Sequence, residues 1–185
     1  MWLFLLSEIL LFGGLFLLYS AYRYKNPLDF HLAAWDLNRA LGTINTLILI
    51  TSSLLIALSI LFIQNGNRKL SMLFLLGTIA LGLLFLGIKF IEWTAKIEHG
   101  LYPNSSRLLG RNRGEVLFYG LYYSMTGLHG LHVLVGVFLL SVMMVLMMKG
   151  KINEKRFIPL ENSGLYWHLV DIIWIFLFPL FYLMT

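Results

Sequence analysis

The sequence predicts an all-α integral membrane protein, built as a bundle of five transmembrane helices. Hydrophobic residues make up 59% of the 185 residues, only 12% are charged, and the mean hydropathy is +0.80. Water-soluble domains rarely have such a composition. The apolar residues also gather in five runs, and each run reaches the ~20 residues that an α-helix needs to cross a bilayer.

The five helices are expected at about residues 1–22, 41–63, 70–95, 116–148 and 164–184, within one domain that spans residues 1–185. The first run begins Met1-Trp2-Leu3-Phe4 and has no basic segment before it, so it is expected to be an uncleaved span. The fourth run exceeds the thickness of a bilayer, and the third continues past Ile88. Both helices are therefore expected to tilt or to protrude.

The basic residues in the loops favour a cytoplasmic N-terminus and an external C-terminus. With that orientation, the inner segments 64–69 and 149–163 hold six Lys and Arg in 21 residues, whereas the outer segments 23–40 and 89–115 hold eight in 45. The inner loops are thus the more densely basic, as the positive-inside rule requires, although the total count favours the outer segments.

The composition argues against cysteine chemistry and against nucleic-acid binding. The chain has no cysteine, which removes disulfides, thiolate metal sites, iron-sulfur clusters and thiol nucleophiles. Its net charge of +5 arises from basic residues in short loops between apolar runs, where membrane topology accounts for them. A nucleic-acid partner is therefore not expected.

A few ionisable residues interrupt the apolar runs, and each is a candidate functional residue. A charge at the centre of a bilayer costs at least ~2.5 kcal/mol, so each needs a partner, a cavity or access to the interface. They are Glu8, Lys89, Glu92, His129, His132, His168 and Asp171.

Lys89 and Glu92 lie near the end of the third helix and are three residues apart, so they share one face and are expected to form an ion pair. The favoured interpretation is an interfacial pair whose side chains extend to the membrane surface. The alternative is a role in proton transfer or in contact with lipid headgroups.

The histidines suggest a metal site, but the ligand set is too small. His129 and His132 share a face of the fourth helix, and His168 and Asp171 share a face of the fifth. Two such pairs facing each other could in principle hold a metal ion, yet di-iron helix bundles use more carboxylates than these spans contain. We therefore expect no metal and favour hydrogen bonds between or within helices, with His168 and Asp171 as one candidate pair.

Glu8 is the most ambiguous of these residues. It lies about 10 Å from the N-terminal end of the first helix at 1.5 Å per residue, too deep for a short side chain to reach the interface easily. Two interpretations are balanced: a carboxyl group that takes part in proton handling, and one that is hydrogen-bonded to a neighbouring helix.

Several of these residues lie within longer strings that resemble subunit III of haem-copper terminal oxidases. Residues 126–133 (TGLHGLHV) and 166–174 (YWHLVDIIW) are similar to the last two helices of that family. Residues 7–12 resemble the first helix of its five-helix core, Glu92-Trp93 the end of the third, and Glu161 lies at the family's spacing before His168. The resemblance covers essentially the whole chain.

The resemblance implies an accessory subunit that carries no haem or copper and performs no catalysis by itself. It would pack on the catalytic subunit I of a cytochrome c or quinol oxidase, together with subunit II and a small subunit IV. It would support proton uptake, oxygen access and structural phospholipids. Glu8 would match the carboxylate that carbodiimide modifies in the family, and the His and Asp residues would be structural.

The chain resembles the short form of the family, because it lacks the first two helices of the long form. The long form holds lipids in a cleft beside those two helices, so no lipid site can be transferred to particular residues here. Lys89 also departs from the family's pattern and is placed to neutralise Glu92. The resemblance further implies an inner N-terminus, a bacterial cytoplasmic membrane, and membership in a respiratory chain, where the oxidase could join a larger assembly.

Two other functions remain as alternatives. A subunit-III-like protein associated with nitric oxide reductase would have the same fold, and only its partner would distinguish it. A stand-alone proton-coupled transporter using Glu8 and Glu92 is disfavoured, because no broken helices or inverted repeat mark a transport site.

Overall fold

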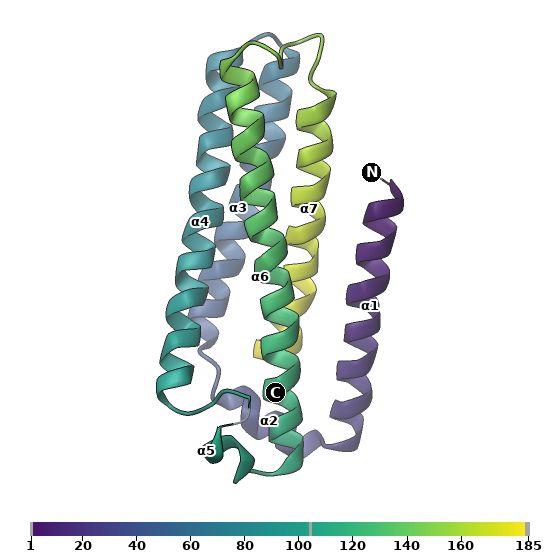
Figure 1. Cartoon of the computed structure of the whole chain (residues 1–185), viewed down its shortest axis with the longest axis vertical. Helices are drawn as coiled ribbons and strands as arrows, with labels where there is room; N and C mark the ends of the chain where they lie inside the picture. Colours follow the sequence, from purple (N-terminus) through teal and green to yellow (C-terminus); the bar gives the residue numbers. More distant parts are fainter. Residues whose placement is uncertain (1, 104, 184–185) are drawn as a thin grey trace. The chain divides into compact units, whose positions relative to one another are not determined.

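The computed structural model describes residues 2–103 and 105–183, and these residues form helices, turns and no strand. The helices are α1 (Trp2–Lys25), α2 (Pro27–Trp35), α3 (Arg39–Gln64), α4 (Arg68–Glu98), α5 (Ser106–Leu109), α6 (Arg113–Met148) and α7 (Ile158–Phe178), labelled in Figure 1. A π-helical turn (Pro179–Leu183) extends α7. Pro179 lacks an amide hydrogen, so regular α-helical bonding cannot continue through it.

Five of these segments are long and apolar enough to cross a membrane: α1, α3, α4, α6, and α7 with its π-helical turn. The predicted all-α class and the five candidate membrane-spanning helices are therefore confirmed, and the orientation of the chain stays a prediction. The last helix starts at Ile158, before the predicted residue 164, and two short helices, α2 and α5, were not predicted. Met1 and Met184, at the ends of the first and last predicted helices, lie outside the described residues, as does Thr185.

The chain divides into two compact units that do not follow sequence order. Unit 1 comprises residues 1–44, 88–129 and 173–185, and unit 2 comprises residues 45–87 and 130–172. Helices α3, α4, α6 and α7 each contribute residues to both units. The expectation of a single domain stays a prediction.

Aromatic side chains from four segments form the core of unit 1. Tyr19 of α1 packs edge-on against Phe30 of α2 and Phe181 of the π-helical turn, at centroid distances of 5.3 and 5.0 Å. Phe118 of α6 contacts the same two rings at 5.5 and 5.6 Å. The Tyr19 hydroxyl also donates to the Leu180 carbonyl at 2.7 Å. The short helix α2 is thus held against α1 and α6 by ring packing.

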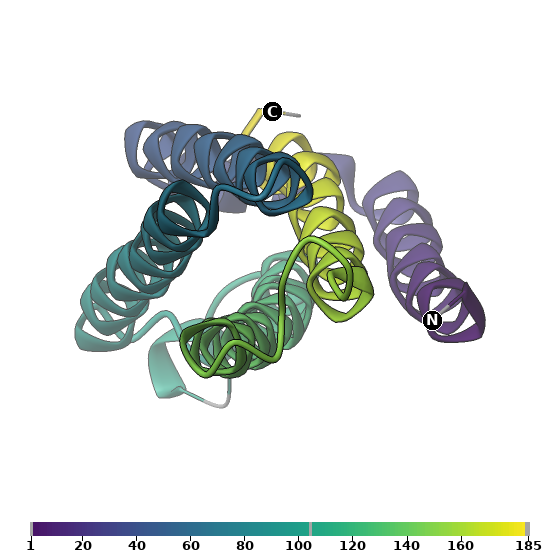
Figure 2. The ribbon, with the colours of Figure 1, turned by 90° about the horizontal axis from the view of Figure 1, so that it is seen from above.

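Four helical segments surround the core of unit 2, and Figure 2 shows them from above. Ser59 of α3 and Ser71 of α4 donate to each other's carbonyl oxygens at 2.9 and 2.8 Å. Trp167 of α7 lies where glycines leave space: an added Cβ at Gly82 or Gly136 would come within 2.6 and 2.8 Å of its ring. Small residues therefore set the close approach of α4, α6 and α7 here.

The helices α3 and α6 each end in a left-handed glycine within unit 2. Gly66 has φ 76° and Gly150 has φ 74°. The next amides, of Asn67 and Lys151, donate back to the Phe62 and Leu146 carbonyls at 2.9 and 3.0 Å. This is the Schellman arrangement, which stops the helix and turns the chain into the following loop.

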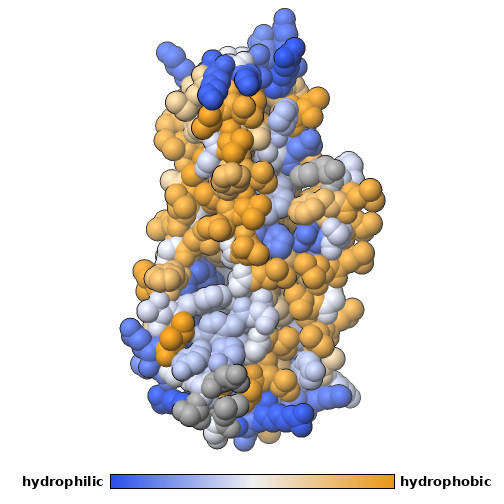
Figure 3. All heavy atoms as spheres, in the orientation of Figure 1, coloured by the Kyte–Doolittle hydropathy of each residue, from blue (hydrophilic) through white to orange (hydrophobic). Residues whose placement is uncertain are grey.

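The hydropathy of the surface differs between the helices and the loops. Hydrophobic residues cover much of the visible side of the helices, while strongly hydrophilic residues gather at the loops (Figure 3). Exposed side chains such as Leu17, Leu47, Leu73 and Phe138 are between 60 and 75% accessible, as expected of surfaces that contact lipid or a partner subunit.

Candidate functional site

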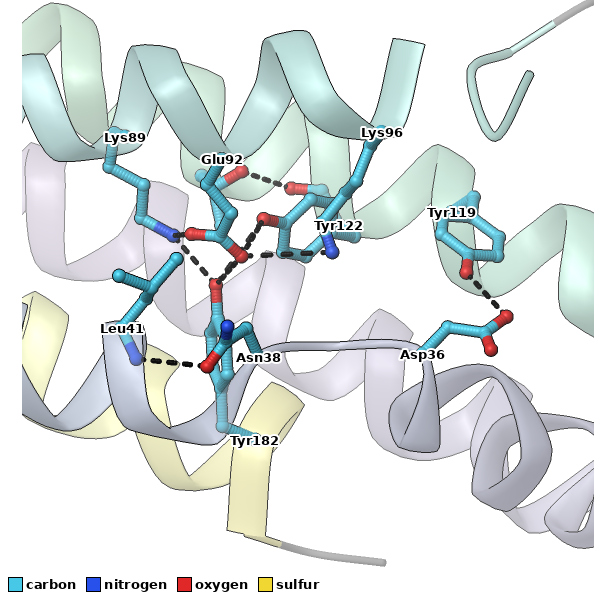
Figure 4. A network of polar contacts seen from close by, with 10 residues as sticks. Asp36, Asn38, Leu41, Lys89, Glu92, Lys96, Tyr119, Tyr122 and Tyr182 are labelled. Carbon is cyan, nitrogen blue, oxygen red and sulfur yellow. Dashed lines mark hydrogen bonds and ion pairs between the residues drawn. The ribbon is translucent and has the colours of Figure 1, made fainter. Parts of the chain in front are cut away.

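The most polar interior position in the described structure is a cluster of five side chains in unit 1. We call Lys89, Glu92, Lys96, Tyr122 and Tyr182 the Glu92 cluster (Figure 4). The three charged residues follow each other at i, i+3 and i+7 on α4, so one helix face carries all of them. Tyr122 comes from α6 and Tyr182 from the π-helical turn at the end of the chain.

The Glu92 carboxylate is the centre of the cluster. Its Oε2 accepts a hydrogen bond from the Lys89 ammonium at 2.9 Å. Its Oε1 accepts from the hydroxyls of Tyr122 and Tyr182 at 2.9 and 2.6 Å, and lies 3.7 Å from Lys96 Nζ. Glu92, Lys96 and Lys89 are only 3, 6 and 8% exposed. Both carboxylate oxygens therefore have buried donors as partners, which a buried charge requires.

Aromatic rings complete the surroundings of the two ammonium groups. Lys89 Nζ donates to the Tyr182 hydroxyl at 2.7 Å and lies 4.6 Å from the centroid of the Trp174 ring. Lys96 Nζ lies 5.0 Å from the centroid of Tyr122. These distances are within the range of cation–π attraction, which offsets part of the loss of hydration.

The Glu92 carboxylate thus links α4 to α6 and to the π-helical turn that follows α7. Two lysines and one glutamate give the cluster a formal charge of +1, and each buried ion would cost several kcal/mol without its partners. Lys89 and Glu92 form the ion pair that their spacing suggested, but both side chains are buried among aromatic rings and do not extend along an exposed interface. The geometry favours a structural role for the pair.

A second polar cluster in unit 1 joins the turn after α2 to the start of α6 and the residues just before it. Asp36, in the turn after α2, accepts from Arg111 Nη1 at 2.8 Å and from the Tyr119 hydroxyl at 3.0 Å. The same Arg111 nitrogen donates to Glu115 at 2.7 Å. The hydrogen bond to Asp36 raises the pKa of the Arg111 guanidinium above its ordinary value, so Arg111 stays charged throughout the physiological range. Asp36 thereby fixes the segment before α6 to α2.

Arg111→Gln is expected to lower the free energy of unfolding by about 0.5–1 kcal/mol, because these groups are partly exposed and screened by solvent. The same change should speed proteolysis of the segment 99–112. Equilibrium unfolding in detergent and limited proteolysis would measure the two effects. Arg113→Gln, which removes an exposed arginine two residues later, is the matched control. Equal behaviour of the two variants would contradict the role of Arg111.

Polar residues of unit 2 form bonds between α3 and α7. His168 Nδ1 lies 2.6 Å from the Ser53 hydroxyl, and Trp167 Nε1 donates to the Ser52 hydroxyl at 3.0 Å. Ser53, and not Asp171, is therefore the hydrogen-bond partner of His168. Asp171 is buried in the same unit. The expected pair is replaced by a contact between helices, which the sequence spacing could not reveal.

The remaining candidates are distributed over both units. Glu8 is half-buried on α1, and His129 is buried on α6 with its ring 5.2 Å from that of Trp174. Both belong to unit 1, whereas His132 belongs to unit 2, where its carbonyl accepts from the Tyr166 hydroxyl at 3.0 Å. Within residues 2–103 and 105–183, no three His, Asp or Glu side chains are grouped so that they could hold a metal ion.

Sequence reasoning missed several members of the two polar clusters. Lys96 lies four residues after Glu92, so helical spacing could have identified it as a second cation on the same face. Tyr122 and Tyr182 lie 30 and 90 residues from Glu92, and no local signal links them to it. The Asp36–Arg111 contact spans 75 residues and likewise has no local signal.

Comparison with known proteins finds similarity along the whole chain. The family model described as "Cytochrome c oxidase subunit III" matches residues 1–185. The "Cytochrome c oxidase subunit 3" of Thermostichus vulcanus is 34% identical over 183 residues, which cover 98% of this chain and 84% of that protein. The "Probable quinol oxidase subunit 3" of Staphylococcus haemolyticus is 25% identical over 182 residues, covering 98 and 86%.

A further relative is a fused protein. The "Heme-copper oxidase subunit I+III" of Aeropyrum pernix is 32% identical over 191 residues, which cover 99% of this chain. The chain spans 22% of the length of that protein. The similarities thus extend over both units and all five membrane-spanning segments.

Proposed function

Because the chain belongs to the cytochrome c oxidase subunit III family, we propose that it is a non-catalytic subunit of a proton-pumping haem-copper oxidase in an aerobic respiratory chain. The observation that carries this proposal is the match of the family model to the whole chain, residues 1–185. In this role the chain stabilises the catalytic subunit I and supports its proton uptake, oxygen access and lipid contacts. Haem and copper belong to partner subunits.

The fused relative supports the proposed partner. Its name joins subunits I and III in one protein, which fixes them at equal numbers in that protein. We propose the same pairing for this chain, with subunit II and a small subunit IV completing the complex. The proposed location is the bacterial cytoplasmic membrane, with the N-terminus inside and the C-terminus outside.

Co-purification tests the proposed function. An affinity-tagged chain, extracted from native membranes in mild detergent, is expected to bring with it a haem-bearing subunit I whose haem spectrum responds to reduction. Mass spectrometry of the co-purified proteins identifies the partner subunits. Isolation of the chain without any haem protein would contradict the proposal, and a nitric oxide reductase in its place would assign the chain to that enzyme.

The orientation is tested separately, because the chain has no native cysteine. A single cysteine at Lys155, exposed in the loop after α6, should react with a membrane-impermeant maleimide only after the cells are opened. A cysteine at Lys25, exposed at the end of α1, should react in intact cells. The reverse pattern would overturn the proposed orientation.

Glu8→Gln is expected to assemble with the catalytic subunit and to retain most of its oxygen reduction, because Glu8 adjusts proton delivery and does not perform the chemistry. Oxygen consumption by the purified complex, normalised to haem, is the measurement. Glu98→Gln, at the exposed end of α4, removes a carboxylate outside the apolar part of the spans and serves as the control. Complete loss of activity in a fully assembled Glu8→Gln complex would contradict this assignment.

A further inference from the structure

The short helix α2 presents apolar side chains on two opposite faces. Phe30 and Ala34, on its inner face, are each only 2% exposed. Leu28, Leu32 and Trp35 follow each other at i, i+4 and i+7 and form an outer face, where they are 77, 56 and 63% exposed. A helix that is apolar on both sides needs an apolar environment on both sides. The outer face of α2 therefore calls for surroundings other than water.

Helix α2 lies at the level where two membrane spans end. Only Asn26 separates it from the end of α1 at Lys25, and residues 36–38 separate it from the start of α3 at Arg39 (Figure 1). The 24 residues of α1 extend about 36 Å, which exceeds the ~30 Å of a hydrocarbon core, so α1 ends among the headgroups. Because α2 is tied to a span at each end, it stays at the membrane surface.

The ring contacts of α2 define its depth. Phe30 packs against Tyr19 of α1 at 5.3 Å between centroids, and Tyr19 lies about 9 Å along the helix from Lys25. Phe30 also packs against Phe118, in the second turn of α6, at 5.5 Å. The inner face of α2 is therefore level with the terminal turns of both spans, where headgroups give way to acyl chains.

The residues around the outer face are those that favour a membrane interface. Tyr24, at the end of α1, is 89% exposed. Lys25 and Arg39 are exposed at the two ends of α2, and the Arg39 guanidinium lies 4.8 Å from the centroid of the Trp35 ring. Aromatic rings and cations gather where spans meet the headgroups, and interfacial helices combine an apolar face with such cations.

The outer face of α2 differs from a helix interface within a membrane. Such interfaces are enriched in small residues, which let two backbones approach closely. The small residues of α2, Ala33 and Ala34, are instead buried in unit 1. The Trp35 Nε1–H donates to His31 Nε2 at 3.1 Å, so the indole already has its acceptor within the chain. The outer face is therefore better suited to lipid than to another subunit.

We propose that α2 is an interfacial helix, whose outer face of Leu28, Leu32 and Trp35 is inserted into the leaflet in which α1 ends and is not covered by another subunit. The helix thereby fixes the depth at which the chain passes from α1 to α3. This inference does not depend on the proposed function. Its failure would leave the association with subunit I untouched, because depth in the membrane is measured and not oxygen reduction.

A depth measurement tests the proposal, because the sequence contains no cysteine. Leu32→Cys is labelled with nitrobenzoxadiazole, and the chain is placed with its co-purified subunits in phosphatidylcholine nanodiscs. Its emission should be blue-shifted and quenched most by a spin label near the top of the acyl chains. The same label on Leu17→Cys, about 12 Å back along α1 from Lys25, should be quenched most by a spin label near their middle. Lys155→Cys, in an exposed loop, should be quenched only by aqueous iodide.

The fluorescence of Trp35 provides a second measurement that needs no label. The emission of the unaltered chain minus that of Trp35→Phe is the contribution of Trp35, and brominated phosphatidylcholine should quench it. The contribution of Trp167, obtained in the same way from Trp167→Phe, should be quenched less, because that side chain is fully buried.

Three results would overturn the proposal. Quenching of the label on Leu32→Cys by iodide and not by lipid would place the outer face in water. Protection of that label from both quenchers, lost when the chain is isolated from its partners, would place the face under another subunit. A Trp35 contribution that brominated lipid leaves unchanged would show that the indole does not reach the acyl chains.

Discussion

Glu92→Gln is expected to lower the free energy of unfolding by about 3–5 kcal/mol, the cost of removing one partner from a buried ion pair. The change leaves the Lys89 ammonium, 8% exposed, without its carboxylate. It also weakens the acceptor of two tyrosine hydroxyls, from α6 and from the end of the chain. Unfolding in mixed detergent micelles, followed by circular dichroism, is the measurement.

Two further variants identify the cause of that loss. Glu98→Gln makes the same chemical change on the same helix at an exposed position and should cost less than 0.5 kcal/mol, as is usual at the surface. The double variant Lys89→Met, Glu92→Gln removes the closer of the two ammonium groups that lose their carboxylate, so it should recover part of the stability, while Lys96 stays buried without its partner. If Glu92→Gln were as stable as Glu98→Gln, the buried ion pair would not hold these segments together.

Trp167→Ala is the second large effect expected, with a loss of about 3 kcal/mol in the free energy of unfolding. The Trp167 ring is fully buried in unit 2 and lies against Gly82 and Gly136, where an added Cβ would clash with it. Its Nε1–H donates to the Ser52 hydroxyl. Its removal leaves a cavity and takes one hydrogen bond from the Ser52 hydroxyl, which still donates to the Leu49 carbonyl at 2.7 Å. We expect the low end of the range known for Trp to Ala in soluble proteins, because lipid is as apolar as the helix interface.

The glycines provide an internal test of this packing. Gly136→Ala should destabilise the unaltered chain by about 1–3 kcal/mol, since its Cβ would meet the Trp167 ring at 2.8 Å. It should cost less in the presence of Trp167→Ala, where the Tyr166 ring at 3.2 Å remains the close neighbour. Trp2→Ala, at a position 78% exposed, is the control for removing an indole. Additive effects of the Gly136 and Trp167 changes would show that the two positions are not in contact.

The membrane spans could be predicted from the sequence because hydropathy and length alone specify a helix in lipid. The short helix α2 was missed because its nine residues are too few to form an apolar run, although Asn26-Pro27 is a recognisable helix start. The early start of α7 was missed because Glu161 and Asn162 interrupt the apolar run, while Pro159 in its first turn was compatible with a helix.

The polar sites were predictable only where the contact is local. The Lys89–Glu92 pair follows from helical spacing, and Lys96 could have been added by the same rule. Burial of the pair depends on Tyr122 and Tyr182, which reach Glu92 from other segments. Ser53 reaches His168 across 115 residues, so spacing could not identify it as the partner of His168. Helical periodicity shows which face of a helix a residue occupies, but it does not show which side chains pack against that face.

The serine contact between α3 and α4 bears on how the chain enters the membrane during synthesis. The two helices are joined by residues 65–67, and Ser59 and Ser71 bond reciprocally across the turn. Both bonds are local in sequence, so they can form as soon as α4 leaves the ribosome and before α6 and α7 exist. Each serine hydroxyl then already has a hydrogen-bond acceptor when α3 and α4 enter the hydrocarbon region of the membrane. The pair α3–α4 can therefore be inserted by the translocation machinery as one preformed hairpin.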